Sequence, residues 1–198
     1  MSKATRFTAR ATESSETESR SRLPDILAAG LSVIFCGINP STNTAQTGFH
    51  FASGTNRFWR VLHGAGFTPH RIAPQEGGDL LRYGCGLTVA VARPTAGAND
   101  LSRQELRQAK AGLESKITRY APRIVAFLGK PAYGAMTGSN ELVWGPQPGR
   151  FGGAEAWVLP NPSGRNRSFS FEALVHAYSE LKESLDRATA TTPRVAVR

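Results

Sequence analysis

Four short, nearly unbroken apolar runs constrain the fold more than any other feature of the chain. They are SVIFCGI (32–38), CGLTVAV (85–91), RIVAFLG (123–129) and AWVLP (156–160). A strand with one face in water alternates apolar and polar residues, whereas a continuous apolar run is typical of a parallel strand covered on both faces. We therefore predict an α/β fold of three layers, α/β/α, with a central, mainly parallel, four-stranded sheet.

Helical patterns fill the intervals between these runs. Ser102 and Glu105 have the spacing of a capping box, which favours a helix start at this point. The last pattern carries an apolar stripe at helical spacing, made of Phe171, Leu174, Val175, Tyr178, Leu181 and Leu185. The predicted helices span residues 56–66, 75–82, 102–118, 131–137 and 170–186.

The chain of 198 residues is long enough for one domain with a sizeable core. Residues 1–22 are rich in Ser, Thr, Arg and Glu, so they hold too little apolar surface to offset the entropy lost on folding. We predict a disordered N-terminal tail at 1–22, a single domain at 23–187 and a flexible C-terminal tail at 188–198. The sequence has no apolar run of roughly 18 residues, so we expect no membrane association.

Positive charge dominates the chain, with Lys and Arg exceeding Asp and Glu by nine. Residues 1–22 contribute only five basic and three acidic side chains, so the predicted domain is itself basic. This balance favours a polyanionic partner such as nucleic acid. Cys36 and Cys85 lie within apolar runs, which favours buried thiols over a disulfide and fits a reducing cytoplasm. The four histidines show no ligand-like spacing, so no metal is implied.

Polar residues gather where two of the predicted strands end. The first strand runs into GINPS (37–41) and a long polar and aromatic loop, and the fourth runs into PNPSGRNR (160–167). Ligands of open parallel sheets bind where the carboxyl ends of the strands meet their loops. One Asn-Pro pair is ordinary turn chemistry. Two pairs at one edge of the sheet, at Asn39 and Asn161, indicate a binding site.

These segments resemble a known family. FCGINPSTNTAQTGFHFASGTNRFW (35–59) together with LPNPSGRNR (159–167) resembles the mismatch-specific uracil/thymine DNA glycosylases, the Mug/TDG branch of the uracil-DNA glycosylase superfamily, through the G-I-N-P and N-P-S-G motifs. The likeness extends over about residues 24–187. It implies the uracil-DNA glycosylase fold and an enzyme that flips a base out of a mismatched duplex and hydrolyses its N-glycosidic bond.

The resemblance also implies roles for residues of the first motif. Asn39 would orient the attacking water, and since a carboxamide is not a strong base, turnover should be slow. Backbone N–H groups near Gly48 and Phe49 would stabilise the anionic leaving base. Phe51 would stack on the flipped base, although a core position suits it equally well. The predicted substrate-binding residues are Gly37, Ile38, Gly48, Phe49, Phe51 and Asn161.

The second motif would enter the duplex. Gly164 would let the backbone approach the DNA closely, and Arg165 would fill the space left by the flipped nucleotide. Asn166 would contact the base on the opposite strand that has lost its partner. The family usually has Leu where this chain has Arg165, which leaves selectivity for the opposite guanine open. For Arg167, contact with phosphate alone is an equal alternative. The predicted DNA-binding residues are Lys130, Ser163, Gly164, Arg165, Asn166 and Arg167.

Two further residues have competing interpretations. Asp100, in RPTAGAND (93–100), could be the general base that Asn39 cannot be, but we favour a role in capping the helix that starts near Ser102. Lys130, in LGKPAYG (128–134), could hold a DNA phosphate at a helix N-terminus or mark an ordinary strand-to-helix junction.

We therefore predict a monofunctional, monomeric glycosylase of base excision repair in the bacterial cytoplasm, which needs no cofactor. Its substrate would be double-stranded DNA with G·U or related mismatches, from which it excises uracil, with ethenocytosine or thymine as further candidates, and leaves an abasic site. One alternative is a DNA-binding protein that recognises mismatches or damage without cleavage. Another is a hydrolase of free nucleosides, for which an arginine-rich insertion loop would be pointless.

Overall fold

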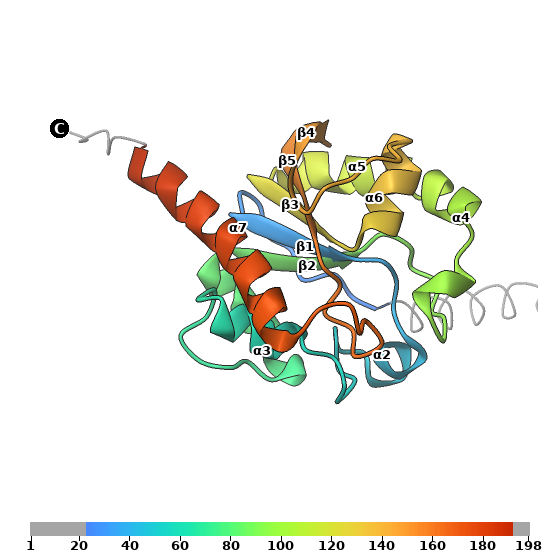
Figure 1. Ribbon diagram of the computed structural model, residues 1–198, viewed down its shortest axis with the longest axis horizontal. Coiled ribbons are helices and arrows are strands. Elements are labelled where there is room, and N and C mark those ends of the chain that lie inside the picture. Colours follow the sequence, from blue (N-terminus) through green and yellow to red (C-terminus); the bar gives the residue numbers. More distant parts are fainter. Residues whose placement is uncertain (1–22, 192–198) are drawn as a thin grey trace, which may run out of the picture.

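The computed structural model describes residues 23–191 and forms one sheet with the strand order β2-β1-β3-β5-β4 (Figure 1). Its four parallel strands coincide with the four apolar runs, which confirms the predicted α/β fold with a mainly parallel central sheet. These strands are β1 (Val33–Gly37), β2 (Cys85–Val89), β3 (Ile124–Leu128) and β5 (Ala154–Leu159).

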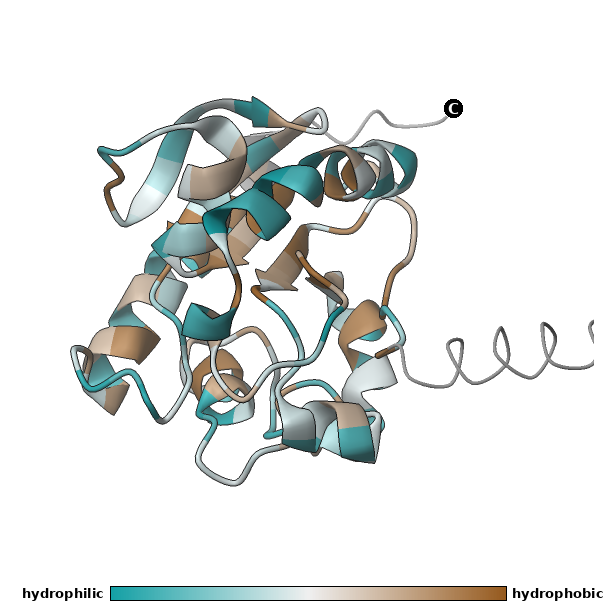
Figure 2. Cartoon of the chain, turned by 90° about the vertical axis from the view of Figure 1, so that its right-hand side faces the viewer, coloured by the Kyte–Doolittle hydropathy of each residue, from teal (hydrophilic) through white to brown (hydrophobic). Residues whose placement is uncertain are grey.

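Both faces of the sheet are covered by helices, because successive side chains of a strand point to opposite faces. Val33 and Phe35 of β1 belong to the core beneath one helical layer, and Ile34 and Cys36 belong to the core beneath the other. Figure 1 shows the two layers, and Figure 2 shows the apolar strands between them. One layer holds α3 (Phe58–Gly64), η1 (Pro74–Tyr83) and α7 (Phe171–Thr191), and the other holds α4 (Arg103–Gln108), α5 (Lys110–Tyr120) and α6 (Lys130–Thr137).

The fifth strand, β4 (Gly145–Phe151), was not predicted, so the expectation of four strands is wrong. Its sequence GPQPGRF contains two prolines and two glycines and no apolar run. β4 pairs antiparallel with β5 at the edge of the sheet, with a register shift between Pro146 and Arg150. Proline cannot donate a ladder hydrogen bond, and a sheet edge is where that loss is tolerated.

The predicted helix at 102–118 is two helices, since α4 ends and α5 begins around Ala109. The capping box at its start is confirmed: Glu105 N donates to Ser102 Oγ at 3.1 Å, and Ser102 N donates to Glu105 Oε2 at 2.9 Å. A short helix, α2 (Thr42–Thr47), lies in a segment expected to be loop. Ser41 caps its start, and a left-handed Gly48 ends it.

The predicted apolar stripe of α7 is buried against the sheet, with Leu174, Tyr178 and Leu181 fully inaccessible to solvent. The helix continues to Thr191, past the domain end expected at 187. The predicted N-terminal tail and residues 192–198 lie outside the described residues. Cys36 and Cys85 are both buried with free thiols, as expected. Within residues 23–191, no helix combines the length and the apolar character needed to cross a bilayer.

His50 joins the start of the described chain to the segment that follows α2. Its ring is 3% exposed, and its Nε2 lies 2.9 Å from Pro24 O. A carbonyl can only accept, so Nε2 carries the hydrogen. Burial lowers the pKa of His50 below 6.5, and the bond to Pro24 and the charge of Asp25 oppose this shift only in part. The buried ring is therefore held neutral.

We expect the neutral His50 ring to make the free energy of unfolding depend on pH. Below pH 6.5 the unfolded chain takes up the proton before the folded protein does, so the free energy of unfolding should fall as the pH drops from 6.5 towards the lowered pKa. In His50→Gln this part of the decline should disappear, whereas the exposed His70→Gln should retain it. Urea unfolding between pH 5 and pH 8 measures the effect, and equal slopes in all three proteins would refute it.

Candidate active site

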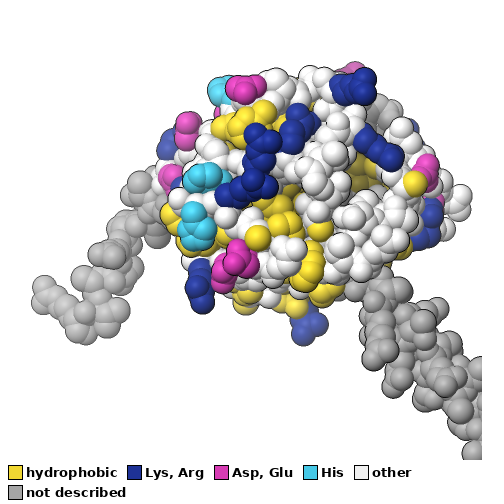
Figure 3. Space-filling view, turned by 90° about the horizontal axis from the view of Figure 1, so that it is seen from below, with side chains coloured by type: hydrophobic (Ala, Val, Ile, Leu, Met, Phe, Trp, Pro, Cys, Tyr) yellow, Lys and Arg dark blue, Asp and Glu magenta, His cyan; other side chains and the backbone are white. Residues whose placement is uncertain are grey.

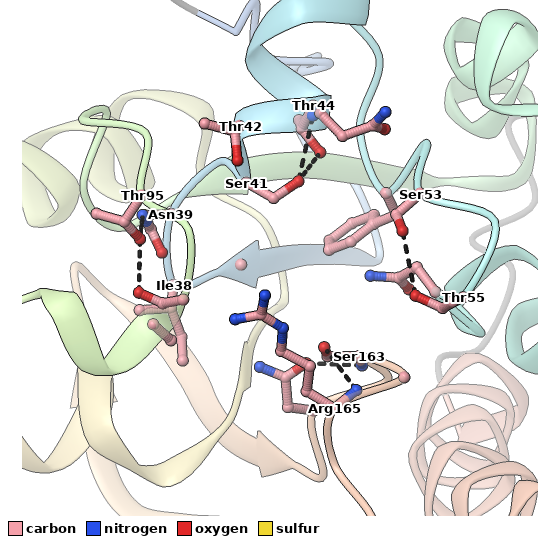
Figure 4. A pocket seen from close by; sticks show the side chains of 18 of the residues that line it. Ile38, Asn39, Ser41, Thr42, Thr44, Ser53, Thr55, Thr95, Ser163 and Arg165 are labelled. Carbon is pink, nitrogen blue, oxygen red and sulfur yellow. Dashed lines mark hydrogen bonds between the residues drawn. The ribbon is translucent and has the colours of Figure 1, made fainter.

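A cavity of about 310 Å³ opens at the carboxyl ends of the parallel strands, where four chain segments converge (Figure 4). Most of the lining comes from residues 37–44, 51–56, 95–98 and 161–165. Eight of the predicted site residues line the cavity: Gly37, Ile38, Asn39, Phe51, Asn161, Ser163, Gly164 and Arg165. Six do not: Gly48, Phe49, Asp100, Lys130, Asn166 and Arg167.

The orientation of the Asn39 carboxamide follows from its partners. Its Nδ2 donates to Arg93 O at 3.0 Å, to Pro40 O at 3.2 Å and to Thr95 Oγ1 at 2.7 Å. Backbone carbonyls accept only, so the amide nitrogen must face this loop and Oδ1 must point the other way. Among the described residues, nothing donates a hydrogen bond to Oδ1. The cavity therefore contains an oriented acceptor that can hold a water molecule.

Thr95 fixes this orientation, and the sequence did not single it out. Its hydroxyl accepts from Asn39 and donates to Gly97 O at 2.7 Å, so its hydrogen is committed to Gly97. Its backbone N–H donates to Pro40 O at 3.1 Å, which ties the loop after β2 to the loop after β1. The only sequence signal is its position just beyond the second apolar run.

Phe51 lines the cavity and also packs on the core. Its ring stacks on Phe58 with centroids 4.1 Å apart, and a Cβ on Gly37 would lie 3.5 Å from its Cζ.

The backbone N–H groups of Gly48 and Phe49 form hydrogen bonds within their own turn. The Gly48 N–H donates to Thr44 O at 2.9 Å, and the Phe49 N–H donates to a hydroxyl within the same turn. In this arrangement neither N–H group points into the cavity.

The loop after β5 presents Asn161 from the opposite wall. Asn161 Oδ1 accepts from Ser163 N at 2.9 Å, so its amide nitrogen is turned away from the loop and has no partner among the described residues. The Asn166 amide is used within the loop, because its Nδ2 donates to Asn161 O at 2.8 Å. At Gly164 a Cβ would lie 2.6 Å from Thr55 O, so only glycine allows the loop to lie this close to its neighbour.

Arg57 holds the whole loop in place, although nothing in the sequence marks it beyond its position in NRFW. Its guanidinium donates to four backbone carbonyls of the loop, with distances of 2.8 Å to Phe169 O, 2.9 Å to Asn166 O, 3.1 Å to Ser163 O and 3.4 Å to Pro162 O. Its own backbone N–H donates to Pro162 O at 3.0 Å. A single planar cation thereby satisfies carbonyls spread over eight residues.

A sequence model described as the Uracil DNA glycosylase superfamily matches residues 24–182. The chain belongs to this superfamily. A Methanosarcina acetivorans protein, solved by solution NMR and provisionally described as a uracil DNA glycosylase, superposes with a TM-score of 0.56. The two chains are 19% identical, and the match covers 82% of this chain and 98% of that chain, which shows a shared fold. Membership of the uracil-DNA glycosylase superfamily supports glycosidic hydrolysis on DNA, and hence a role in DNA repair.

The two arginines of the loop after β5, Arg165 and Arg167, lie in different surroundings. Arg165 reaches back over the cavity, where its Nη1 lies 2.9 Å from the place that a Cβ on Gly97 would occupy. Figure 4 shows its guanidinium directed into the cavity. Arg167 is exposed and makes no polar contact with the described residues. Lys and Arg side chains also gather on the face formed by the layer of α3 and α7 (Figure 3).

Asp100 and Lys130 lie beside the glycosylase cavity rather than in it. Asp100 Oδ2 accepts from Gly97 N at 2.9 Å and closes the short turn η2 (Ala98–Asp100). The cap of α4 is Ser102, so the expectation that Asp100 caps this helix is wrong. Lys130 begins α6, and its Nζ lies 4.5 Å from the centroid of the Trp144 ring.

Removal of the Arg57 guanidinium should loosen the loop that carries Asn161. We expect Arg57→Ala to lower the free energy of unfolding by about 1.5–3 kcal/mol, because hydrogen bonds from a charged donor are lost and carbonyls are left unpaired. Amide exchange at residues 163–169 should quicken. Arg57→Lys keeps the charge but lacks the planar fork, so it should resemble Arg57→Ala. Arg71→Ala, at an exposed position with no polar contact to other described residues, is the control and should leave the loop unchanged. Unaltered exchange in Arg57→Ala would contradict the assignment.

Proposed function

We propose that the protein is a monofunctional DNA glycosylase that extrudes uracil from mismatched duplex DNA and hydrolyses its N-glycosidic bond, leaving an abasic site. We assign it to the mismatch-specific uracil/thymine branch because of its paired motifs, with ethenocytosine and thymine as further candidate substrates. The observation that carries the proposal is the oriented acceptor Asn39 Oδ1, which faces the cavity at the strand ends.

In the proposed reaction, the extruded base enters between Asn39 and Asn161, against the ring of Phe51. Asn39 Oδ1 accepts a hydrogen bond from a water molecule and directs its oxygen at C1′ of the sugar. The bond from C1′ to N1 breaks, and its electron pair stays with the base. The carboxamide cannot take the proton, so the water keeps it until its oxygen has bonded to the electron-poor C1′, and the proton then passes to the departed base anion. This order requires the bond to be largely broken before attack, so turnover is slow.

The negative charge that develops on the leaving base needs a hydrogen-bond donor to stabilise it. The amide nitrogen of Asn161 is suited to this, because its own oxygen is occupied by Ser163 N and the nitrogen has no partner in the described chain. We assign the donor role to this amide and not to Gly48 or Phe49, because their N–H groups already donate hydrogen bonds within their own turn. A donor held in place by the loop costs no reorganisation as charge appears.

Water as the nucleophile fits the residues around the cavity. Among the described residues, no lysine lines the cavity to offer an amine that could attack the sugar, and Asp100 stands outside the lining. The loop of residues 161–167 would enter the duplex, with Arg165 leaving the cavity mouth to fill the space of the extruded nucleotide. We propose a monomer acting in a reducing cytoplasm, which is compatible with its two free, buried thiols.

Single-turnover release of uracil tests this function with three substrates, G·U duplex, A·U duplex and single-stranded DNA. We expect the G·U duplex to react fastest, because a mispaired base costs less to extrude. Asn39→Ala should slow release by about 100-fold or more while DNA affinity is retained. Asp100→Ala should react nearly as fast as the unmodified protein. Equal rates on all substrates with loss only in Asp100→Ala would refute the mechanism, and DNA binding without release would favour a non-catalytic damage-recognition protein.

Thr95 should act through the orientation of Asn39. In Thr95→Val the carboxamide loses an acceptor at nearly constant side-chain shape, so we expect uracil release to slow by about 10-fold, roughly the effect of one hydrogen bond. Affinity for a duplex with an uncleavable abasic analogue should not change, because binding does not use this bond. Thr95→Ser restores the hydroxyl and should recover most of the rate. A valine variant as fast as the serine variant would contradict this role.

A further inference from the structure

Trp144 is exposed where the other tryptophans are buried. Of the three tryptophans in the chain, Trp59 is 4% and Trp157 is 6% exposed, whereas Trp144 is 40% exposed. Its neighbour Val143 is 64% exposed. Burying an aromatic side chain contributes strongly to core stability, so a ring left in water is a candidate for contact with a partner.

The position of Trp144 links it to the candidate active site. It immediately precedes β4, whose Gly145 pairs with Val158, so it lies beside the carboxyl end of β5 from which the Asn161 loop departs. Its ring meets the Phe169 ring edge to face, with centroids 5.3 Å apart. Phe169 ends the same loop, and its carbonyl accepts from Arg57. The exposed ring therefore stands next to the segment proposed to enter DNA.

A cation also lies close to the Trp144 ring. Lys130 Nζ lies 4.5 Å from the Trp144 centroid and forms no ion pair with any carboxylate in the described part of the chain. Lys130 lies two residues beyond Leu128, which is the last residue of β3 and lines the cavity. An exposed aromatic ring beside an unpaired cation is the combination that binds single-stranded nucleic acid, where bases stack and phosphates pair with the cation.

We propose that Trp144 is a second aromatic contact for the damaged DNA strand, outside the base cavity: an unpaired base stacks on its exposed ring while Lys130 holds the adjoining phosphate. This inference rests on the proposed action on DNA. Bases of an intact duplex are already stacked, whereas bases of a single strand are free to leave their neighbours. Trp144 therefore contributes more to the binding of single-stranded or frayed DNA than to that of an intact duplex.

Tryptophan fluorescence tests the contact directly, because only one of the three rings is accessible to acrylamide. We expect Trp144→Phe to remove the readily quenched fraction of the emission. Addition of a uracil-free single-stranded oligonucleotide, with binding followed by the anisotropy of a label on the DNA, should protect the same fraction in the unmodified protein. Binding without protection overturns the inference and leaves the proposed function intact. Absence of binding to single-stranded DNA also overturns it, and only the additional absence of binding to a G·U duplex counts against the proposed function.

Without DNA, the quenching of Trp144 by acrylamide could decrease as the protein concentration rises. That result would show that a second copy of the chain covers the ring, and it would also overturn the inference.

Affinity for the same oligonucleotide supplies a second readout. We expect Trp144→Ala to weaken binding by about 5- to 140-fold, the effect of removing one stacking ring. Trp144→Phe should weaken it less, and Val143→Ala, the exposed neighbour, should leave it unchanged. The salt dependence of binding separates stacking from charge. It should be unaltered in Trp144→Ala and shallower by roughly one phosphate contact in Lys130→Ala. A shallower slope in Trp144→Ala would mean that the ring only positions Lys130, which overturns the stacking role.

Discussion

The guanidinium of Arg57 is the interaction on which the candidate site depends. A loop that leaves the carboxyl end of a strand exposes backbone carbonyls that secondary structure does not satisfy, and each needs a donor. Arg57 supplies donors to four of them from the start of α3, with no carboxylate as intermediary. This fixes the loop against Thr55, at a separation that only Gly164 permits. Asn161 then faces Asn39 across the cavity because its loop has a single docked position.

The two asparagines of the cavity present opposite hydrogen-bonding groups for the same physical reason. Carbonyl and hydroxyl oxygens hold the amide nitrogen of Asn39, which leaves its oxygen as an acceptor. A backbone N–H holds the oxygen of Asn161, which leaves its nitrogen as a donor. Identical side chains thus present an acceptor on one wall and a donor on the other. Hydrogen bonds to neighbouring groups fix both orientations, so neither amide can rotate without losing one.

The sequence predicted the elements whose signals are local. Continuous apolar runs located the four parallel strands, and the rule for ligands at strand ends located two of the four segments that line the cavity, those that carry Asn39 and Asn161. The edge strand GPQPGRF (145–151) was missed because its pairing with β5 outweighs poor strand propensity. Arg57 and Thr95 were missed for another reason. Their partners lie 105 to 112 and 56 positions away in the sequence, so no spacing pattern marks them before the chain folds.

The use of a carboxamide where a carboxylate could stand has consequences for selectivity. Under the proposed mechanism, Asn39 aligns the water but does not raise its nucleophilicity, so the rate follows how readily the base departs as an anion. The ease of extrusion adds to this, because a mispaired base leaves the duplex at lower cost. Under this mechanism, discrimination between bases depends on the lability of the glycosidic bond and on the strength of base pairing. Both are properties of the DNA, and both affect the rate when the protein extrudes a base.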